Sequence, residues 1–283
     1  MNNKDITAVI TTFKSEKKIN NCLKSINSNI KVLIVENSNN YDFKKKIENM
    51  YENVECILTN ENLGYGKANN IGLSKVKTKY ALILNPDTIL QENTILNFFK
   101  RINKSNIDFS IIGPILFQEK NIYKNNESDS TNLIRVKNVK GFAMFLNLEQ
   151  FKDIKYFDEN FFLYFEEIDL CKRLRNKNQN IYLDPEIKIY HDGGQSVDTD
   201  HSEQIELNRN WHWMWSTFYY HKKHSTYLFA FLIVLPNLFS SVFKILYYSL
   251  KGNLKRKAIY KQRLSGLLNS ILGRKSWYRP SLD

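Results

Sequence analysis

Four apolar runs, separated by segments with helical spacing, dominate the first 90 residues. They lie at residues 6–13, 31–36, 54–58 and 80–84 and are rich in aliphatic and β-branched side chains. Strands that are apolar throughout, rather than alternating, are typical of a parallel sheet covered by helices on both faces. We therefore predict an α/β fold with a Rossmann-like, mostly parallel central sheet flanked by helices.

The charge of the chain is unevenly distributed. The formal net charge is +12 over 283 residues. Residues 1–200 hold 28 Lys and Arg against 26 Asp and Glu, whereas residues 201–283 hold 13 against 3. We predict one large globular domain over residues 1–220 and a basic helical extension over residues 221–283.

Cysteine usage and the N-terminal sequence bear on the compartment. Cys22, Cys56 and Cys171 are odd in number and widely spaced, which argues against a disulfide framework or a zinc site. The N-terminus lacks the basic region and long apolar stretch of a signal peptide. We therefore expect a cytoplasmic protein.

Polar residues follow three of the predicted strands, at residues 11–13, 36–38 and 85–87. The carboxyl ends of parallel strands meet at one edge of the sheet, where open α/β folds bind their ligands. At that edge the Asp87 carboxylate could bind a divalent ion together with substrate phosphates. The alternative is that Asp87 caps a helix predicted over residues 88–99.

An acidic cluster, formed by Glu166, Glu167 and Asp169, follows the aromatic run 161–165. Burial beside aromatic rings and a neighbouring negative charge both raise the pKa of a carboxyl group, and such groups serve as general bases. The alternative is an exposed helix start, where the helix dipole favours anions. Arg173, four residues after Asp169, is expected to steady it.

Two further segments suit a metal or a phosphate. His191 ends an apolar run and is followed by two glycines, so its imidazole could be a ligand or could be structural. Glycines within residues 62–66 precede a predicted helix whose N-terminus suits a phosphate or a sugar. The pattern is neither a GxGxxG motif nor a P-loop.

In chain order these motifs resemble the family 2 glycosyltransferases with the GT-A fold, in particular bacterial rhamnosyltransferases of surface-polysaccharide synthesis. The resemblance covers about residues 6–196 and is carried by TTF, VENS, NLGYGKANN, LNPD, GFAMF and FLYFEEIDLCKR. It implies an inverting, metal-dependent transfer of L-rhamnose from dTDP-rhamnose. The alternative donor is a UDP-hexose or UDP-N-acetylhexosamine. The implied acceptor is a polyprenyl-diphosphate-linked saccharide of O-antigen or capsule synthesis.

The resemblance also implies roles for individual residues. Glu167 stands at the catalytic base position, and Asp87 and His191 stand as ligands of Mg²⁺ or Mn²⁺. The implied nucleotide and donor contacts are Thr11, Phe13, Glu36, Asn37, Gly64, Lys67, Asn69, Asn85 and Asp87. The implied acceptor-side residues are Gly141, Glu166, Asp169 and Trp211. Glu36 and Glu167 depart from the family pattern, which more often has Asp there, and Asn85 replaces the first acid of Asp-x-Asp.

The tail combines an apolar segment with a basic one. Residues 227–250 are apolar apart from Pro236 and a narrow polar stripe, and residues 253–272 form a basic amphipathic pattern. We predict an interfacial anchor on an anionic membrane surface, at the inner face of the bacterial plasma membrane. The alternative is that both helices pack on the globular domain or on a second subunit, giving a homodimer.

Two other functions would draw on the same residues. Nucleic-acid binding is not expected, because the positive charge lies beside an apolar helix and not on a polar face with spaced aromatics. A degenerate transferase acting as a membrane scaffold is the non-enzymatic alternative. The presence of Asp87, Glu167 and His191 argues against it.

Overall fold

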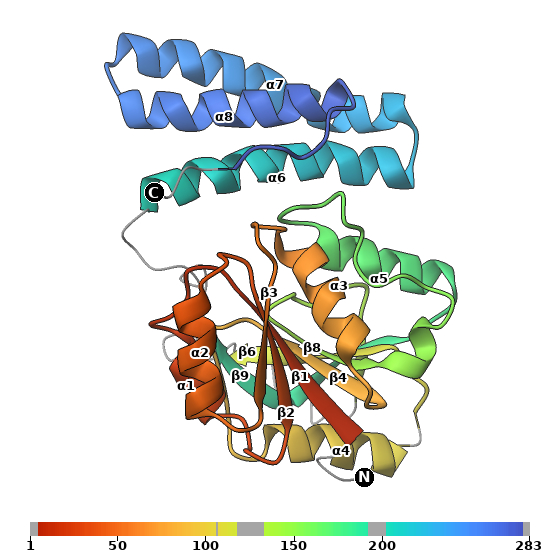
Figure 1. The fold of residues 1–283 in the computed structure, drawn as a ribbon. Helices are drawn as coiled ribbons and strands as arrows, with labels where there is room; N and C mark the ends of the chain where they lie inside the picture. The colour runs from red at the N-terminus through yellow and green to blue at the C-terminus, as the bar shows by residue number, and fades with distance from the viewer. Residues whose placement is uncertain (1–4, 106, 118–132, 192–201, 280–283) are drawn as a thin grey trace. The chain divides into compact units, whose positions relative to one another are not determined.

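The fold is described from a computed structural model that covers residues 5–105, 107–117, 133–191 and 202–279 (Figure 1). The chain divides into two compact units. The first comprises Met1–Phe157 and Leu170–Asp198, and the second comprises Asp158–Asp169 and Thr199–Asp283. Helix α5 (Glu166–Asn176) contributes its first turn to the second unit and its remainder to the first.

The first unit is built on a single sheet. In the described residues the sheet has nine strands in the order β3-β2-β1-β4-β8-β6-β9-β5, with β7 paired to β9. The strands are β1 (Ile6–Thr12), β2 (Lys31–Glu36), β3 (Val54–Leu58), β4 (Tyr80–Leu84), β5 (Thr88–Leu90), β6 (Ile111–Phe117), β7 (Ile134–Arg135), β8 (Ala143–Asn147) and β9 (Ile181–His191).

The sheet is mixed but mostly parallel. Pairing is parallel along β3-β2-β1-β4 and between β6 and β9, whereas β8 runs antiparallel to both β4 and β6. Strands β5 and β7 pair antiparallel with β9. The predicted fold class is confirmed, and the carboxyl ends of β1, β2, β3 and β4 share one edge.

Helices cover both faces of this sheet and explain why its strands are apolar throughout. They are α1 (Ile19–Lys24), α2 (Tyr41–Met50), α3 (Tyr65–Lys75), α4 (Thr94–Ser105) and the later turns of α5, with a short 3-10 helix at Leu148–Phe151. Val9 and Ile10, adjacent on β1, belong to different buried clusters. Helix α3 approaches β1 so closely that a Cβ on Gly72 would lie 2.5 Å from Val9 Cγ1.

The structure decides between the two interpretations of Asp87. No helix follows it directly, because Thr88–Leu90 forms β5 and pairs with Ile189–His191. Helix α4 begins only at Thr94. The helix predicted over residues 88–99 therefore starts too early, and Asp87 lies in a turn between two strands, where it caps no helix.

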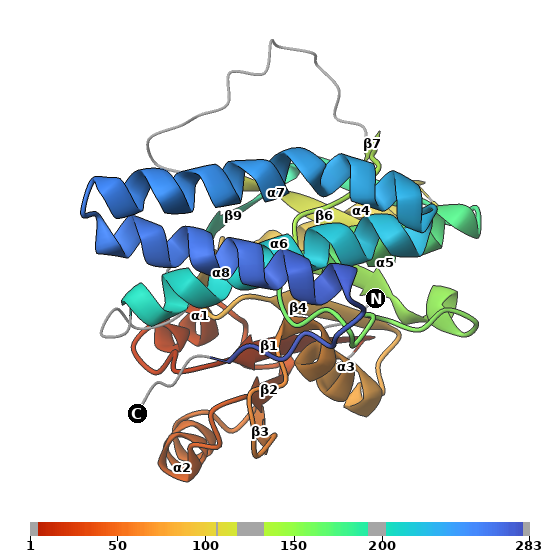
Figure 2. The same ribbon diagram turned by 90° about the horizontal axis from the view of Figure 1, so that it is seen from above.

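The second unit contains three long helices joined by short loops. They are α6 (Ser202–His224), α7 (Tyr227–Leu250) and α8 (Leu254–Ile271), and Figure 2 shows them lying side by side. Met214 and Phe218 of α6, Ala230 and Val234 of α7, and Leu267 of α8 form their core. The predicted division at residues 220 and 221 falls inside α6.

A C-terminal strap, residues 274–279, packs on α6 within this unit. The Trp215 indole donates to the Arg274 carbonyl (3.0 Å). His212 is buried between the Ser276 hydroxyl and the Tyr278 carbonyl, each 2.9 Å from a ring nitrogen. The carbonyl can only accept, so Nε2 carries the proton of a neutral ring and Nδ1 accepts from Ser276.

Candidate functional site

Asp87 and His191 lie together at the carboxyl edge of the first unit's sheet. The antiparallel register of β5 and β9 pairs Thr88 with His191, which brings the imidazole beside Asp87. His191 Nε2 lies 3.3 Å from Asp87 Oδ1. The Asp87 side chain is 0% exposed and that of His191 is 14% exposed, so the pair is shielded but open on the imidazole side.

The surrounding residues fix this pair in place. The Asn85 amide nitrogen lies 3.2 Å from His191 Nε2. The Phe142 ring stacks on the imidazole, with centroids 5.0 Å apart. The backbone N–H of Asn85 donates to the Phe142 carbonyl (2.8 Å), and the Thr88 hydroxyl donates to the Asn85 carbonyl (2.7 Å). The turn that carries Asp87 is therefore held from both sides.

The chemistry of the pair fits a divalent ion that is shared with a substrate. Among the described residues no group of three or more His, Cys, Asp or Glu side chains gathers at one point. Asp87 and His191 thus supply two protein donors. Mg²⁺ and similar ions are commonly held by one or two protein ligands together with substrate phosphates and water. The donor set suits an ion bound together with a diphosphate.

Glu36 and Asn37, at the end of β2, organise the neighbouring loops. The buried Glu36 carboxylate accepts from the backbone and hydroxyl of Ser38 and from the backbone N–H of Asn40 (2.8 Å). The Asn37 amide donates to the Gly64 carbonyl (3.4 Å) and accepts from the Thr59 hydroxyl (3.1 Å). The base contact implied for Glu36 remains a prediction; its observed contacts shape the turn after β2.

The loop before α3 also reaches this edge. Gly64 has φ +80°, a conformation that favours glycine, and its carbonyl accepts from Ala68 in the first turn of α3. Asn69 is buried and donates to the Tyr65 carbonyl (2.9 Å), while Lys67 is half-buried. The free N–H groups of a helix N-terminus suit an anion.

Several polar atoms near this edge lack hydrogen-bond partners within the described residues. In the described part of the chain, Asn69 Oδ1 and Thr11 Oγ1 are buried and have no hydrogen-bond partner. Buried polar atoms are usually paired, so an unpaired one calls for a water or a ligand. Thr11 is the penultimate residue of β1, and Phe13, two residues on, is half-buried. These positions are compatible with the donor contacts predicted for them.

The acidic cluster belongs to the second unit. Glu166 is buried, and its burial followed by the charge of Glu167 raises its pKa well above the ordinary 4.5. Burial also raises the pKa of Glu167. Within the described residues Glu166 Oε2 has no hydrogen-bond partner. The three acids lie in the first turn of α5, as the helix-start interpretation expects, but they are not exposed, because Glu166 and Asp169 are buried and Glu167 is half-buried.

A strained backbone segment precedes these acids. Tyr164 and Phe165 have φ values of +71° and +70°, a region that side-chain-bearing residues seldom adopt. Their rings pack against Trp213 of α6, with centroids 5.2 and 5.5 Å apart. The Ser216 hydroxyl donates to the Leu163 carbonyl (2.9 Å). Strain of this kind persists only where the surroundings enforce it, and it is frequent at functional sites.

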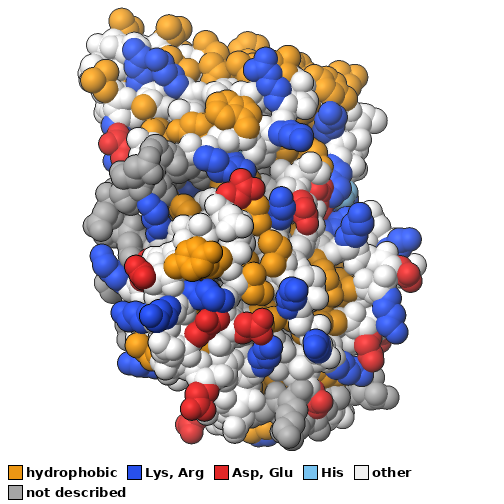
Figure 3. Space-filling view, in the orientation of Figure 1, with side chains coloured by type: hydrophobic (Ala, Val, Ile, Leu, Met, Phe, Trp, Pro, Cys, Tyr) orange, Lys and Arg blue, Asp and Glu red, His pale blue; other side chains and the backbone are white. Residues whose placement is uncertain are grey.

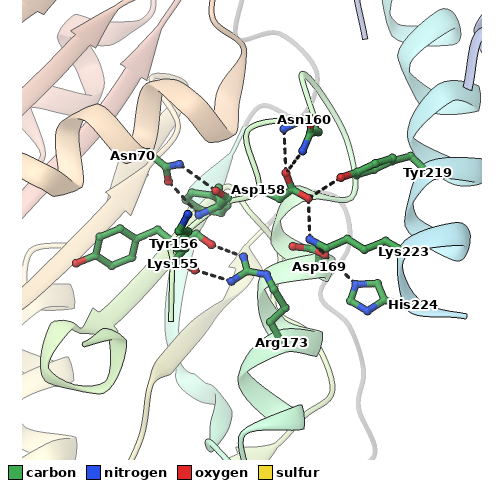
Figure 4. Close-up of polar contacts among 11 residues, drawn as sticks. Asn70, Lys155, Tyr156, Asp158, Asn160, Asp169, Arg173, Tyr219, Lys223 and His224 are labelled. Carbon is green, nitrogen blue, oxygen red and sulfur yellow. Dashed lines mark hydrogen bonds and ion pairs between the residues drawn. The ribbon is translucent and has the colours of Figure 1, made fainter. Parts of the chain in front are cut away.

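Asp169 does not face solvent but is held by the end of α6. Its Oδ1 lies 2.6 Å from Lys223 Nζ and 2.8 Å from His224 Nε2 (Figure 4). Arg173, predicted to steady Asp169, donates to the carbonyls of Lys155 and Tyr156. The sequence did not point to Lys223 or His224, because they follow Asp169 by more than fifty residues.

Two predicted acceptor-side residues lie elsewhere. Trp211 is fully buried among the helices of the second unit, where its indole donates to Ser265 (3.1 Å). It is therefore a core residue, and an exposed acceptor contact does not fit this placement. Trp213, two residues further along α6, is exposed. Gly141, in the first unit, offers its carbonyl to the Tyr65 hydroxyl.

Sequence comparison places these residues in a known group. A sequence model of Glycosyl transferase family 2 matches residues 7–171. The hexosyltransferase Agl10 of low-salt glycan biosynthesis in Haloferax volcanii is 26% identical, over 72% of this chain and 69% of that protein. The dTDP-rhamnosyl transferase RfbF of Shigella flexneri is 26% identical, over 67% and 69%. The rhamnosyltransferase WbbL of Escherichia coli K12 is 23% identical, over 65% and 81%.

Solved structures share the fold. The mannosyltransferase PcManGT from Pyrobaculum calidifontis, in complex with GDP-Man and Mn²⁺, has a TM-score of 0.61 at 10% identity, covering 96% of this chain and 88% of that one. The 1–349 fragment of S. aureus TarS has a TM-score of 0.52 at 15% identity, covering 97% and 93%. At such identities the likeness establishes the GT-A fold and nothing finer.

Proposed function

Because this chain belongs to glycosyl transferase family 2, we propose that it transfers a sugar from a nucleotide donor to a lipid-linked saccharide, with inversion at the anomeric carbon. The preferred donor is dTDP-L-rhamnose, since two relatives are named as rhamnosyltransferases. The product would belong to a surface polysaccharide of the O-antigen or capsule type. A lipid-linked acceptor places the reaction at the cytoplasmic face of the plasma membrane.

The observation that carries the donor half of the proposal is the Asp87–His191 pair, whose side chains lie 3.3 Å apart. The N-terminus of α3 lies at the same edge of the sheet, because α3 joins the parallel strands β3 and β4. Asp87 and His191 would hold a Mg²⁺ or Mn²⁺ ion, which neutralises charge on the leaving diphosphate when bound. The N–H groups that open α3 and the Lys67 ammonium contribute further positive potential for the phosphates. Asn85 keeps the imidazole oriented toward Asp87.

On the acceptor side, Glu167 is the proposed base. It takes the proton of an acceptor hydroxyl as that oxygen forms a bond to the anomeric carbon. The bond from that carbon to the diphosphate oxygen breaks, and the diphosphate leaves with the electron pair. A carboxylate whose pKa is raised by burial is a stronger base than an exposed one. Glu166 is more deeply buried, and its pKa is raised by burial and then by the charge of Glu167.

A second donor class is the alternative to dTDP-L-rhamnose. The relative from Haloferax volcanii is named a hexosyltransferase, and another S. aureus TarS structure contains UDP-GlcNAc. A UDP-hexose or UDP-N-acetylhexosamine is therefore the alternative donor. The non-enzymatic alternative, a membrane scaffold, predicts that no nucleotide sugar binds.

The test is calorimetric binding of dTDP-L-rhamnose, UDP-glucose, UDP-N-acetylglucosamine and GDP-mannose, each with Mn²⁺, Mg²⁺ or EDTA. We expect the dTDP-sugar to bind most tightly, and only with metal. Preference for a UDP-sugar would replace the donor and leave the transfer proposal intact. Absence of binding by all four donors with either ion would overturn the transfer proposal.

A further inference from the structure

Helix α7 carries Ser241 and Lys244 on the face that packs against α6 and α8. Ser241, 1% exposed, donates to the Asn237 carbonyl (2.7 Å). Lys244 Nζ lies 3.1 Å from the Tyr260 hydroxyl and 4.8 Å from the centre of its ring. Ala230 and Val234 lie on the same side and enter the helical core. The polar stripe of α7 is thus turned inward.

The opposite side of α7, which we call the outer face, is apolar and exposed. Phe239 is 63% exposed, Phe243 68% and Leu250 90%. At 3.6 residues per turn one stripe contains Leu228, Phe229, Leu232, Phe239, Val242, Phe243, Leu246, Tyr247 and Leu250, all of them exposed. Figure 3 shows hydrophobic side chains gathered over this helix, with Lys and Arg beside them. A helix surrounded by water has the reverse arrangement.

The two helices α7 and α8 carry basic side chains and no acidic ones. Helices α7 and α8 contain no Asp or Glu. Lys251, Lys255, Arg256 and Lys261 are exposed at or beyond the end of α7 and along α8. Lys255 contacts one carboxylate, that of Glu206, at 3.4 Å. This combination of a broad apolar stripe and nearby positive charge matches the acyl and headgroup layers of an anionic bilayer.

We propose that the outer face of α7 inserts in the plane of an anionic bilayer from one side, so that the helix is monotopic and does not cross the membrane. This rests on the membrane location proposed above and names how the chain is held there. Helix α7 alone among the described helices is long and apolar enough to span. However, α8 packs along it and carries five cations, at positions 255, 256, 257, 261 and 263. Crossing with α8 attached would place these charges in hydrocarbon, which is strongly unfavourable.

The first experiment measures binding of the full chain to vesicles of phosphatidylcholine with phosphatidylglycerol, by flotation without any sugar substrate. We expect binding that weakens in pure phosphatidylcholine, and a loss of roughly tenfold or more in the Phe239→Ser/Phe243→Ser variant. The matched control is Met50→Ser/Leu96→Ser, which removes two comparably exposed apolar side chains from α2 and α4. It should bind as the wild type does.

The second experiment distinguishes the monotopic helix from a spanning one. Cysteines introduced singly at Ser225 and Lys251 flank α7, and the native cysteines are buried, so background labelling is low. On intact vesicles a membrane-impermeant maleimide should label both positions to the same extent. If one of the two cysteines reacted only after detergent was added, α7 would cross the membrane and the proposal would be wrong.

The remaining occupant of the outer face would be a second copy of this chain. The proposal is wrong, and the outer face is a subunit interface, if two results are found together. The wild type would bind neither vesicle type and would sediment as a dimer, and the Phe239→Ser/Phe243→Ser variant would sediment as a monomer. Vesicle binding is measured without donor or acceptor. Its failure is therefore distinguishable from failure of the sugar transfer, which a soluble acceptor analogue tests separately.

Discussion

Lys223 Nζ lies 2.6 Å from Asp169 Oδ1 and joins the last turn of α6 to the first turn of α5 within one compact unit. The same ammonium lies 2.7 Å from Asp158 Oδ2. Asp169 is fully buried and sits two residues after Glu167, the proposed base. The C-terminal turn of α6 therefore holds Asp169 of the acidic cluster in place.

The first prediction concerns that support. Lys223→Met removes one of the positive charges beside the buried Asp169 carboxylate. The loss of one partner of a buried ion pair typically lowers the free energy of unfolding by about 3–5 kcal/mol. We expect a drop toward the low end of this range, because Lys223 is itself partly exposed. Urea unfolding measures it. Lys222→Met, the exposed neighbour, is the control, and Asp169→Asn in the Lys223→Met background should recover part of the loss. Equal stability of both Lys variants would contradict the assignment.

The second prediction concerns the metal. Asp87→Asn keeps the size of the side chain but removes the anionic ligand, so donor binding should lose its dependence on Mn²⁺ or Mg²⁺ and weaken at least tenfold. His191→Ala should weaken metal-dependent binding to a smaller extent. Calorimetric titrations with and without EDTA supply the measurement. Asp108→Asn, an exposed carboxylate in the same unit, is the matched control. Unchanged metal dependence in Asp87→Asn would remove Asp87 from the site.

The third prediction concerns the base. Glu167→Gln should lower turnover by roughly 10²–10⁴-fold while donor affinity stays near that of the wild type, because only proton transfer is lost. Rapid-quench turnover and donor titration separate the two effects. Glu166→Gln should retain more activity, since Glu167 and not Glu166 is the proposed base. If Glu166→Gln is the inactive variant and Glu167→Gln is not, the two roles are exchanged.

The pH profile gives a fourth prediction. A base must be ionised to act, and burial raises the pKa of Glu167 above its ordinary 4.5. Activity should therefore rise with pH through that raised pKa, so that the acid limb of kcat/KM lies above pH 4.5. Initial rates at constant ionic strength, with donor binding followed in parallel, report the limb. An acid limb at or below pH 4.5 would show that the base is solvated.

The fifth prediction concerns His212 beneath the C-terminal strap. Burial lowers the pKa of His212 to about 3, so the folded ring is neutral. Between pH 6.5 and about 3 the unfolded chain binds a proton that the folded chain does not. Stability from this group is therefore complete above pH 6.5 and falls by about 1.4 kcal/mol per pH unit below it. Urea unfolding of the wild type and of His212→Gln from pH 7 to 5 should show a shallower decline in the variant. Parallel declines would mean that His212 titrates normally.

Much of the fold could be predicted from the sequence because it depends on burial patterns that are local. Strands such as 31–36 and 80–84 are apolar on both faces, and a sheet covered by helices on both sides buries both faces. The polar residues that end these strands were expected at one edge for the same topological reason. Asp87 and His191 both lie at that edge. The antiparallel pairing of β5 with β9, which brings the two side chains into contact, could not be predicted from sequence spacing.

Other features were decided only by tertiary packing. Periodicity could not show that Trp211 points into the core and Trp213 outward, since both lie in one aromatic run on α6. Nor could it show that Asp169 is neutralised by Lys223, a contact between segments far apart in the chain. The apolar stripe and the basic charge of the tail were determined by the sequence. Which side of α7 faces outward was fixed by the packing of Ala230 and Val234 against α6 and α8. A helical pattern defines faces, and only the neighbouring helices determine which face is covered.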